Sequence, residues 1–214
     1  MIRIQCSVLE QVRKNPTLFG QLLATDGLKK GGTHGMFAYW QDVLLKVHKG
    51  DIDLNRGIKE LQRTFMNFEE TPKNLKKQDF LQDSFTRYHK QFSKRGFSFF
   101  DSKRRMAWNI TTAGLLTGLT PWVVKDASKY YAYYFSEQPL EWHKELKFPL
   151  IQQYLAENSV ECDIKEMSVG VYCLSTNSFM FMNYSKQVLK ASIDETVDIF
   201  EKVNKAFKKT NSIN

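Results

Sequence analysis

The sequence predicts a mixed α/β (α+β) protein, in which a helical N-terminal region is followed by a mixed sheet with helices packed on it. Apolar residues recur at the spacing of a helix through residues 1–100, and they begin to alternate with polar residues at residues 106–112. The 214 residues contain no internal repeat and no linker-like stretch. We therefore expect a single domain over residues 1–214, with a helical part (1–100) and a sheet with flanking helices (101–214).

Four helical stretches precede the expected sheet. Ser7 can cap the first of them, and Asn15-Pro16 interrupts it because the residue before a proline avoids the helical conformation. Phe37 to Val47 show the clearest stripe, with apolar side chains at i, i+3 and i+4. The expected helices cover residues 7–23, 37–47, 58–68 and 80–92.

The second half of the chain predicts strands and helices in turn. Met106 to Thr112 alternate between apolar and polar side chains, which is typical of a strand. Pro121 indicates a bulge or a sheet edge in the next apolar stretch, because proline cannot donate a hydrogen bond to a neighbouring strand. Tyr130 to Phe135 are apolar on both faces, which indicates a central strand. The expected strands cover residues 106–112, 115–124, 130–135, 167–174 and 179–182, and the expected helices cover residues 140–157 and 186–208.

The composition favours a cytoplasmic protein without membrane spans. Cys6, Cys162 and Cys173 are odd in number and far apart, which suits a reducing compartment. The opening residues lack the long apolar core of a secretory signal, and no apolar run approaches the length of a membrane span. No Cys-x-x-Cys pair, metal-binding histidine pair or phosphate-binding glycine loop is present. We therefore expect no metal and no cofactor.

Basic residues concentrate at the boundary between the two halves. The chain has a formal net charge of +8, and residues 73–105 hold ten basic but only three acidic residues, with aromatic residues between them. Such a concentration favours contact with the phosphates of nucleic acid. A solvated helix face with its aromatic residues in the core, or a surface for an acidic protein partner, would give the same pattern. The candidate nucleic-acid-binding residues are Arg87, Lys90, Lys94, Arg95, Lys103, Arg104 and Arg105.

Three short segments carry a family resemblance. The helical stretch Cys6–Pro16 ends in a proline, Gly32-Thr33-His34-Gly35 precedes an amphipathic helix, and Leu116–Val124 is an apolar strand with a glycine inside. Together with the element order α-β-β-β-α-β, these segments resemble the core of the PD-(D/E)XK nuclease superfamily, in particular its RecB-like branch. The resemblance covers most of the chain and implies a restriction-endonuclease-like αβββαβ fold.

The same resemblance implies a protein without the chemistry of that superfamily. Its members hold Mg²⁺ with an acid on the second strand and an acid placed two residues before a lysine on the third strand. Pro121 and Ser136 stand at the corresponding places here. The leading hypothesis is thus a non-catalytic, nuclease-like accessory subunit of a multi-protein DNA-handling complex, in a bacterial defence system against phage or plasmids. Its partners would be other subunits, such as a helicase, a nuclease or an ATPase, and DNA.

Two alternatives remain open. The first is an active Mg²⁺-dependent nuclease with migrated carboxylates, for which the candidates are Asp126, Glu137, Glu145 and Lys147. Glu145 and Lys147 fall in a predicted helix, where their side chains would diverge by about 200°. The second alternative is a subunit that binds only proteins. Trp142, Phe148 and residues 150–155 indicate a helix that is apolar on several sides and would fit beneath another subunit.

Overall fold

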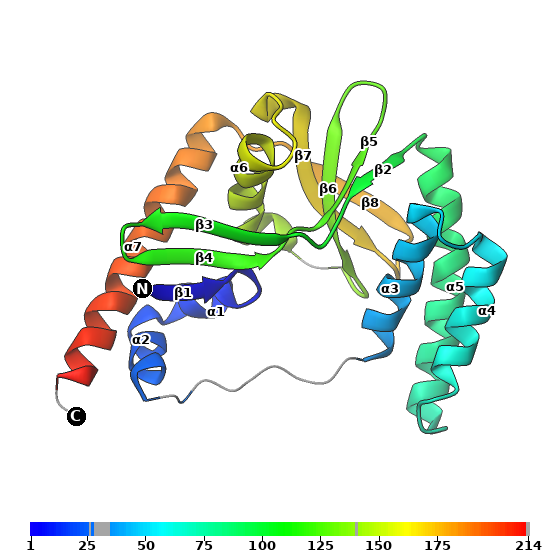
Figure 1. Ribbon diagram of the computed structural model, residues 1–214, viewed down its shortest axis with the longest axis horizontal. Helices are drawn as coiled ribbons and strands as arrows, with labels where there is room; N and C mark the ends of the chain where they lie inside the picture. The colour runs from blue at the N-terminus through cyan, green and yellow to red at the C-terminus, as the bar shows by residue number, and fades with distance from the viewer. Residues whose placement is uncertain (26, 28–34, 140, 213–214) are drawn as a thin grey trace.

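The computed structural model of the protein describes residues 1–25, 27, 35–139 and 141–212, and the expected mixed α/β class is confirmed there (Figure 1). Helices surround two mixed sheets, one of three strands and one of five. The α-helices of the described part are α1 (Leu9–Lys14), α2 (Pro16–Ala24), α3 (Met36–Lys49), α4 (Leu54–Phe65), α5 (Pro72–Lys94), α6 (Lys147–Asn158) and α7 (Lys186–Asn211).

Side-chain caps explain where several helices begin. The side chain of Asn15 accepts a hydrogen bond from the backbone N–H of Leu18, and Asp53, Thr71 and Ser185 cap α4, α5 and α7 in the same way. The helix expected over residues 140–157 begins later than predicted. A short 3₁₀ turn, η2 (Trp142–Lys144), comes first, and Pro149 lies in the first turn of α6, where its missing N–H is tolerated. Residue 140 itself lies outside the described residues.

The eight strands of the described part form the two sheets. They are β1 (Ile2–Gln5), β2 (Ser98–Asp101), β3 (Arg105–Thr111), β4 (Gly114–Leu119), β5 (Trp122–Lys125), β6 (Tyr130–Ser136), β7 (Met167–Cys173) and β8 (Ser178–Met182). The strand orders are β1-β4-β3 and β2-β5-β6-β7-β8. The β1–β4 and β6–β7 pairs are parallel and the others antiparallel. The central position expected for β6 is confirmed.

The strand expected over residues 115–124 is instead two strands in two different sheets. β4 ends at Leu119 in the three-stranded sheet, and β5 begins at Trp122 in the five-stranded sheet. Pro121 lies at the crossing, because a residue without an N–H cannot continue the ladder of hydrogen bonds. The expected single sheet is therefore wrong. The structure also has two strands that are absent from the expected set, β1 and β2, although Ile2 and Ile4 alternate with polar residues as a strand requires.

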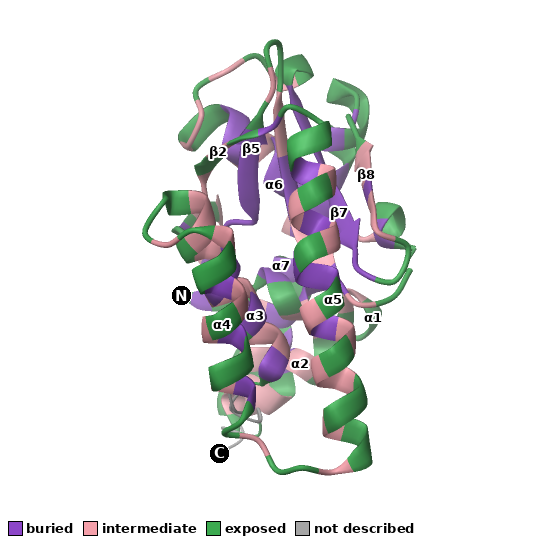
Figure 2. Cartoon of the chain, turned by 90° about the vertical axis from the view of Figure 1, so that its right-hand side faces the viewer, coloured by how far each residue is buried: buried purple, intermediate pink, exposed green. Residues whose placement is uncertain are grey.

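Helix α6 lies between the two sheets and belongs to both of their cores. Leu150, with Leu146 just before the helix, packs with the three-stranded sheet and α7, whereas Ile151 and Leu155 pack on the five-stranded sheet. The opposite face of the five-stranded sheet is covered by α3, α4 and α5, whose inner faces are buried and whose outer faces are exposed (Figure 2). The expectation that another subunit covers this apolar helix is thus wrong, because the chain buries it itself.

Helices α2 and α7 approach each other closely at a glycine. A Cβ placed on Gly20 would lie 2.4 Å from the carbonyl oxygen of Val203 and 2.8 Å from the Cβ of Ala206. Helix backbones do not yield easily, so the absence of a side chain at this position sets how near α2 can lie to α7.

His48, near the end of α3, is enclosed by aromatic rings. Its ring centroid lies 4.3 Å from that of Phe92, 5.4 Å from that of Trp122 and 5.6 Å from that of Phe99. Burial, together with a smaller contribution from the charge of the nearby His89, lowers the pKa of His48 to about 3. The imidazole is therefore neutral in the folded protein at ordinary pH.

We predict that Gly20→Ala destabilises the protein by about 1–3 kcal/mol, because the added methyl group forces the two helices apart. An alanine in an unconstrained helix would instead raise stability by up to about 1 kcal/mol relative to glycine. Urea denaturation of the two proteins measures the difference, and an increase in stability would contradict the close approach.

We also predict that His48 makes the protein lose stability on acidification. At about pH 4.5 an unfolded His48 binds a proton and the folded one does not, so stability present above the ordinary pKa of 6.5 falls as the pH drops toward 3. Between about pH 7 and about pH 4.5 the loss from this residue is on the order of 2 kcal/mol. His48→Phe should reduce the acid-induced loss measured by urea denaturation, and equal losses in both proteins would contradict the prediction.

Candidate nucleic-acid interface

The C-terminal half of α5 presents a basic stripe to solvent. Arg87, Lys90 and Lys94 follow the spacing i, i+3 and i+7, which places them on one side of the helix. Tyr88 and Phe92 fall on the other side and are buried in the core against the five-stranded sheet. Packing of the aromatic side therefore directs the basic side outward.

The structure divides the seven predicted binding residues into two groups, at the two ends of β2. Ser98 pairs with Lys125, so the end of α5 lies beside the β5–β6 turn (Figure 1). Lys103 and Arg104 instead lie beside Thr120, to which their backbones are hydrogen-bonded. A strand rises about 3.3 Å per residue, so the four residues of β2 separate the groups by about 13 Å.

Acidic neighbours neutralise three of these seven cations. Arg87 pairs with Asp83 at 2.8 Å and Arg104 with Asp101 at 2.5 Å, while Lys103 pairs with Asp42. The guanidinium of Arg95 lies 5.7 Å from the ring centroid of Phe179. Among the residues that the structure describes, no ion pair forms at the remaining three, which are Lys90, Lys94 and Arg105. Four cations thus keep their charge for an external anion.

The β5–β6 turn adds two cations to the seven predicted binding residues. Lys125 and Lys129 are both exposed there, on either side of Asp126. These two lysines lie near the basic stripe on α5 because Lys125 pairs with Ser98, which lies four residues after Lys94. A count of charge along the chain could not find them, because about thirty residues separate them from the end of α5.

Asp126, a candidate metal ligand, shapes this turn. Its carboxylate accepts hydrogen bonds from the backbone N–H groups of Ser128 and Lys129 and from the hydroxyl of Tyr131. The N–H of Ser128 is the chief cause that lowers the pKa of Asp126. The carboxylate therefore stays ionised and holds the hairpin in shape.

Glu137, the second candidate, lies at the opposite end of β6 from Asp126. β6 has seven residues, so the two carboxylates are separated by about 20 Å at about 3.3 Å per residue. Glu137 pairs with Lys77 of α5 at 2.9 Å. These two acids cannot bind one metal ion. No cluster of three or more His, Cys, Asp or Glu side chains occurs within the described ranges.

Glu145 and Lys147 do meet, contrary to the expectation that their side chains diverge. Glu145 lies between η2 and α6 with an extended backbone (φ −79°, ψ 129°), so the geometry of a helix does not apply to it. Its carboxylate is 2.6 Å from the amine of Lys147. The amine also lies 5.4 Å from the ring centroid of Tyr134 and 5.1 Å from that of Phe148. The pair therefore anchors the start of α6 to β6.

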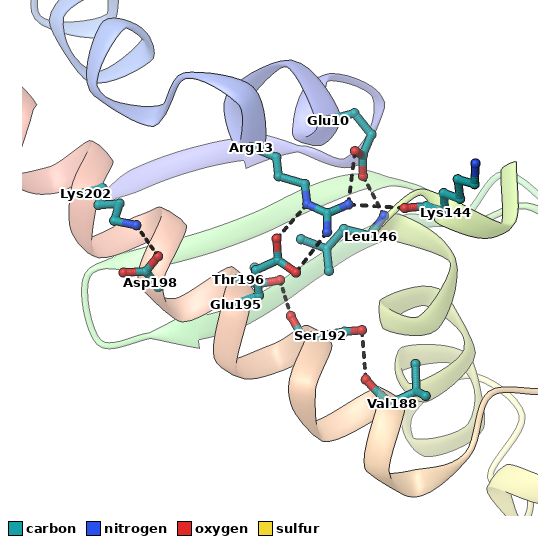
Figure 3. Close-up of polar contacts among 10 residues, drawn as sticks. All are labelled: Glu10, Arg13, Lys144, Leu146, Val188, Ser192, Glu195, Thr196, Asp198 and Lys202. Atoms are coloured by element: carbon teal, nitrogen blue, oxygen red, sulfur yellow. Dashed lines mark hydrogen bonds and ion pairs between the residues drawn. The ribbon is translucent and has the colours of Figure 1, made fainter. Parts of the chain in front are cut away.

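A second polar cluster fixes the same segment from the other side (Figure 3). Arg13 of α1 binds both carboxylate oxygens of Glu195 on α7, at 2.6 and 3.1 Å, and donates to the carbonyl of Lys144 at 3.2 Å. Hydrogen bonding to Glu195 raises the pKa of Arg13. Glu10 accepts a hydrogen bond from the backbone N–H of Leu146, at the start of α6. The cluster thus joins α1, α7 and α6.

The places that the resemblance assigned to acids hold other groups. Ser136 ends β6 and donates a hydrogen bond to the carbonyl of Gln138. Tyr134 donates one to the carbonyl of Leu119, the last residue before the crossing to β5. Residues 32–34, part of the segment that resembles a helix start, lie outside the described residues.

Neither the comparison with models of protein families nor the comparison with curated proteins finds a match to this chain. Within the part of the chain that the structure describes, none of the helices combines the length and the apolar character needed to cross a bilayer.

We predict that Arg13 and Glu195 stabilise the fold as a pair. A double-mutant cycle with Arg13→Met and Glu195→Gln should give a coupling free energy of about 1 kcal/mol, because the pair is bidentate and only part-exposed. The matched control is the more exposed pair Lys202 and Asp198 on α7, for which we expect about 0.3–0.5 kcal/mol. Chemical denaturation measures both coupling free energies. Equal values in the two cycles would contradict the prediction that Arg13 and Glu195 stabilise the fold more than an ordinary surface ion pair.

Proposed function

We propose that the protein is a non-catalytic subunit that binds nucleic acid through the basic end of its five-stranded sheet. This surface, called the basic end below, consists of Lys90, Lys94 and Arg95 from the end of α5 and Lys125 and Lys129 from the β5–β6 turn. The observation that carries the proposal is the pairing of Ser98 with Lys125, which brings the cations at the end of α5 close to those of the β5–β6 turn. Phosphate contacts require such a local excess of cations, and the chain as a whole carries a net charge of +8.

The arrangement of the acids supports a role without catalysis. A nuclease with migrated carboxylates would need two of them at one point to hold Mg²⁺. Asp126 and Glu137 lie at opposite ends of β6, and Glu137 and Glu145 each pair with a lysine. Each of the three acids thus has a structural role that accounts for its position.

The wider setting of this proposal comes from the resemblance of the sequence to the PD-(D/E)XK nuclease superfamily and from the cysteines. A nuclease-like subunit without metal ligands would act beside a catalytic partner, such as a nuclease, helicase or ATPase subunit, and defence against phage or plasmids would be its context. Three free cysteines, two of them buried, fit the reducing cytoplasm. The apolar residues of α6 are no evidence for a protein partner, because they are covered within the chain.

We predict that Lys90→Gln with Lys94→Gln weakens binding to labelled DNA by about tenfold or more at low salt, because two phosphate contacts are lost. The slope of log affinity against log salt should fall by about 1.4 for a single strand. Fluorescence anisotropy titrations at several salt concentrations measure both quantities. The matched control is Lys73→Gln with Lys76→Gln, which removes the same charge from the exposed start of the same helix and should change affinity much less.

Three outcomes would count against the proposal. Equal losses in the two double variants would mean that only the net charge matters. No binding by the unchanged protein at low salt would favour the alternative of a subunit that binds only proteins. Cleaved DNA in the presence of Mg²⁺ or Mn²⁺, abolished by Glu137→Ala, would favour the active nuclease.

A further inference from the structure

A bulge on the edge strand β2 turns one phenylalanine outward. Phe99 pairs with Val124 and Asp101 pairs with Val123, so Phe100 is the extra residue between them. Phe99 points into the core, where its ring lies 5.6 Å from that of His48 and 5.7 Å from that of Trp122. Phe100 is 41% exposed. Bulges commonly redirect a side chain in this way next to functional surfaces.

Tyr130 holds the outward ring of Phe100 in place. The two rings meet edge to face, with their centroids 5.4 Å apart and their planes at 77°. Tyr130 is half-buried, and it packs against the core under α6. An aromatic ring that is fixed by a second ring loses little conformational freedom when it binds a ligand.

Cations lie on both sides of this aromatic pair. Lys125 pairs with Tyr130 across the sheet, so both side chains lie on the same face, and Lys129 directly precedes Tyr130. At the other end of β2, Arg105 is exposed and forms no ion pair with the described residues, whereas Arg104 is paired with Asp101. Phe100 on the edge strand β2 therefore lies between Lys125, which pairs with the start of β2, and Arg105, which follows the end of β2 at the start of β3.

We propose that Phe100 and Tyr130 form a stacking platform for the bases of single-stranded nucleic acid, whose phosphates contact Lys125 on one side and Arg105 on the other. The proposal rests on the function proposed above and specifies its ligand. A fixed aromatic ring between cations matches the alternation of bases and phosphates along a single strand. The bases of a duplex are stacked on each other, so their faces cannot reach the ring.

The test uses three labelled probes with the whole protein: an oligothymidylate, an abasic oligomer of the same length and charge, and a duplex. The unchanged protein should bind the oligothymidylate more tightly than the abasic oligomer. Phe100→Ala should lower its affinity for the oligothymidylate by about 5- to 150-fold and leave the salt dependence and the duplex affinity unchanged. Phe100→Trp should keep the affinity, and the fluorescence of the new indole should be quenched as bases stack on it.

The control variant is Met66→Ala, which removes another exposed apolar side chain (82% exposed) far from β2 in the sequence and should change no affinity. Circular dichroism and thermal melting report whether each variant is folded, which is expected because Phe100 lies on an exposed edge. Equal affinity of Phe100→Ala and the unchanged protein for the oligothymidylate would overturn the platform. So would a loss of the same size for duplex and single strand.

The two proposals fail in different ways. If Lys90→Gln with Lys94→Gln weakens binding but Phe100→Ala does not, the basic end binds phosphates and the stacking platform is wrong. If the unchanged protein binds none of the three probes at low salt, both proposals are wrong.

Discussion

The fold depends on the burial of α6 between two sheets. This helix supplies Leu150 to the core of the three-stranded sheet and Ile151 to the core of the five-stranded sheet, and both side chains are 1% exposed. Gln152, fully buried beside them, exchanges hydrogen bonds with the backbone N–H and carbonyl of Tyr184. A buried polar side chain must find such partners, so Gln152 also fixes how the helix is turned about its axis. The two sheets are thereby placed relative to each other.

The polar contacts at the start of α6 follow from that burial. Glu10 and Arg13 bind the backbone of the segment that enters the helix, and Glu145 and Lys147 tie the same segment to β6. Charged side chains at the edge of a core are stabilising only when each finds a partner. The Glu-x-Lys sequence that resembles a catalytic motif has this structural role, and its acid and base neutralise each other.

The surface charge is organised by the same packing. Aromatic side chains such as Tyr88 bury one side of α5 in the core, so the basic residues on the other side of this helix face solvent. The strand β2 then carries the chain along the sheet edge and leaves basic residues at both of its ends, with Phe100 between them. Three of the cations are neutralised by nearby acids, which leaves the charge concentrated beside the β5–β6 turn.

The sequence by itself determined the type of most elements, the central place of β6 and the excess of positive charge, because helical and strand periodicities are local and charge can be counted. Tertiary structure decided the rest. Pro121 marks an interruption in the sequence, but only the pairing of β5 with β2 and β6 shows that the chain changes sheets there. Likewise, the apolar faces of α6 could be read as a site for a partner until both sheets were seen to cover them. Arg13 and Glu195 are 182 residues apart, and no local pattern predicts a contact over such a distance.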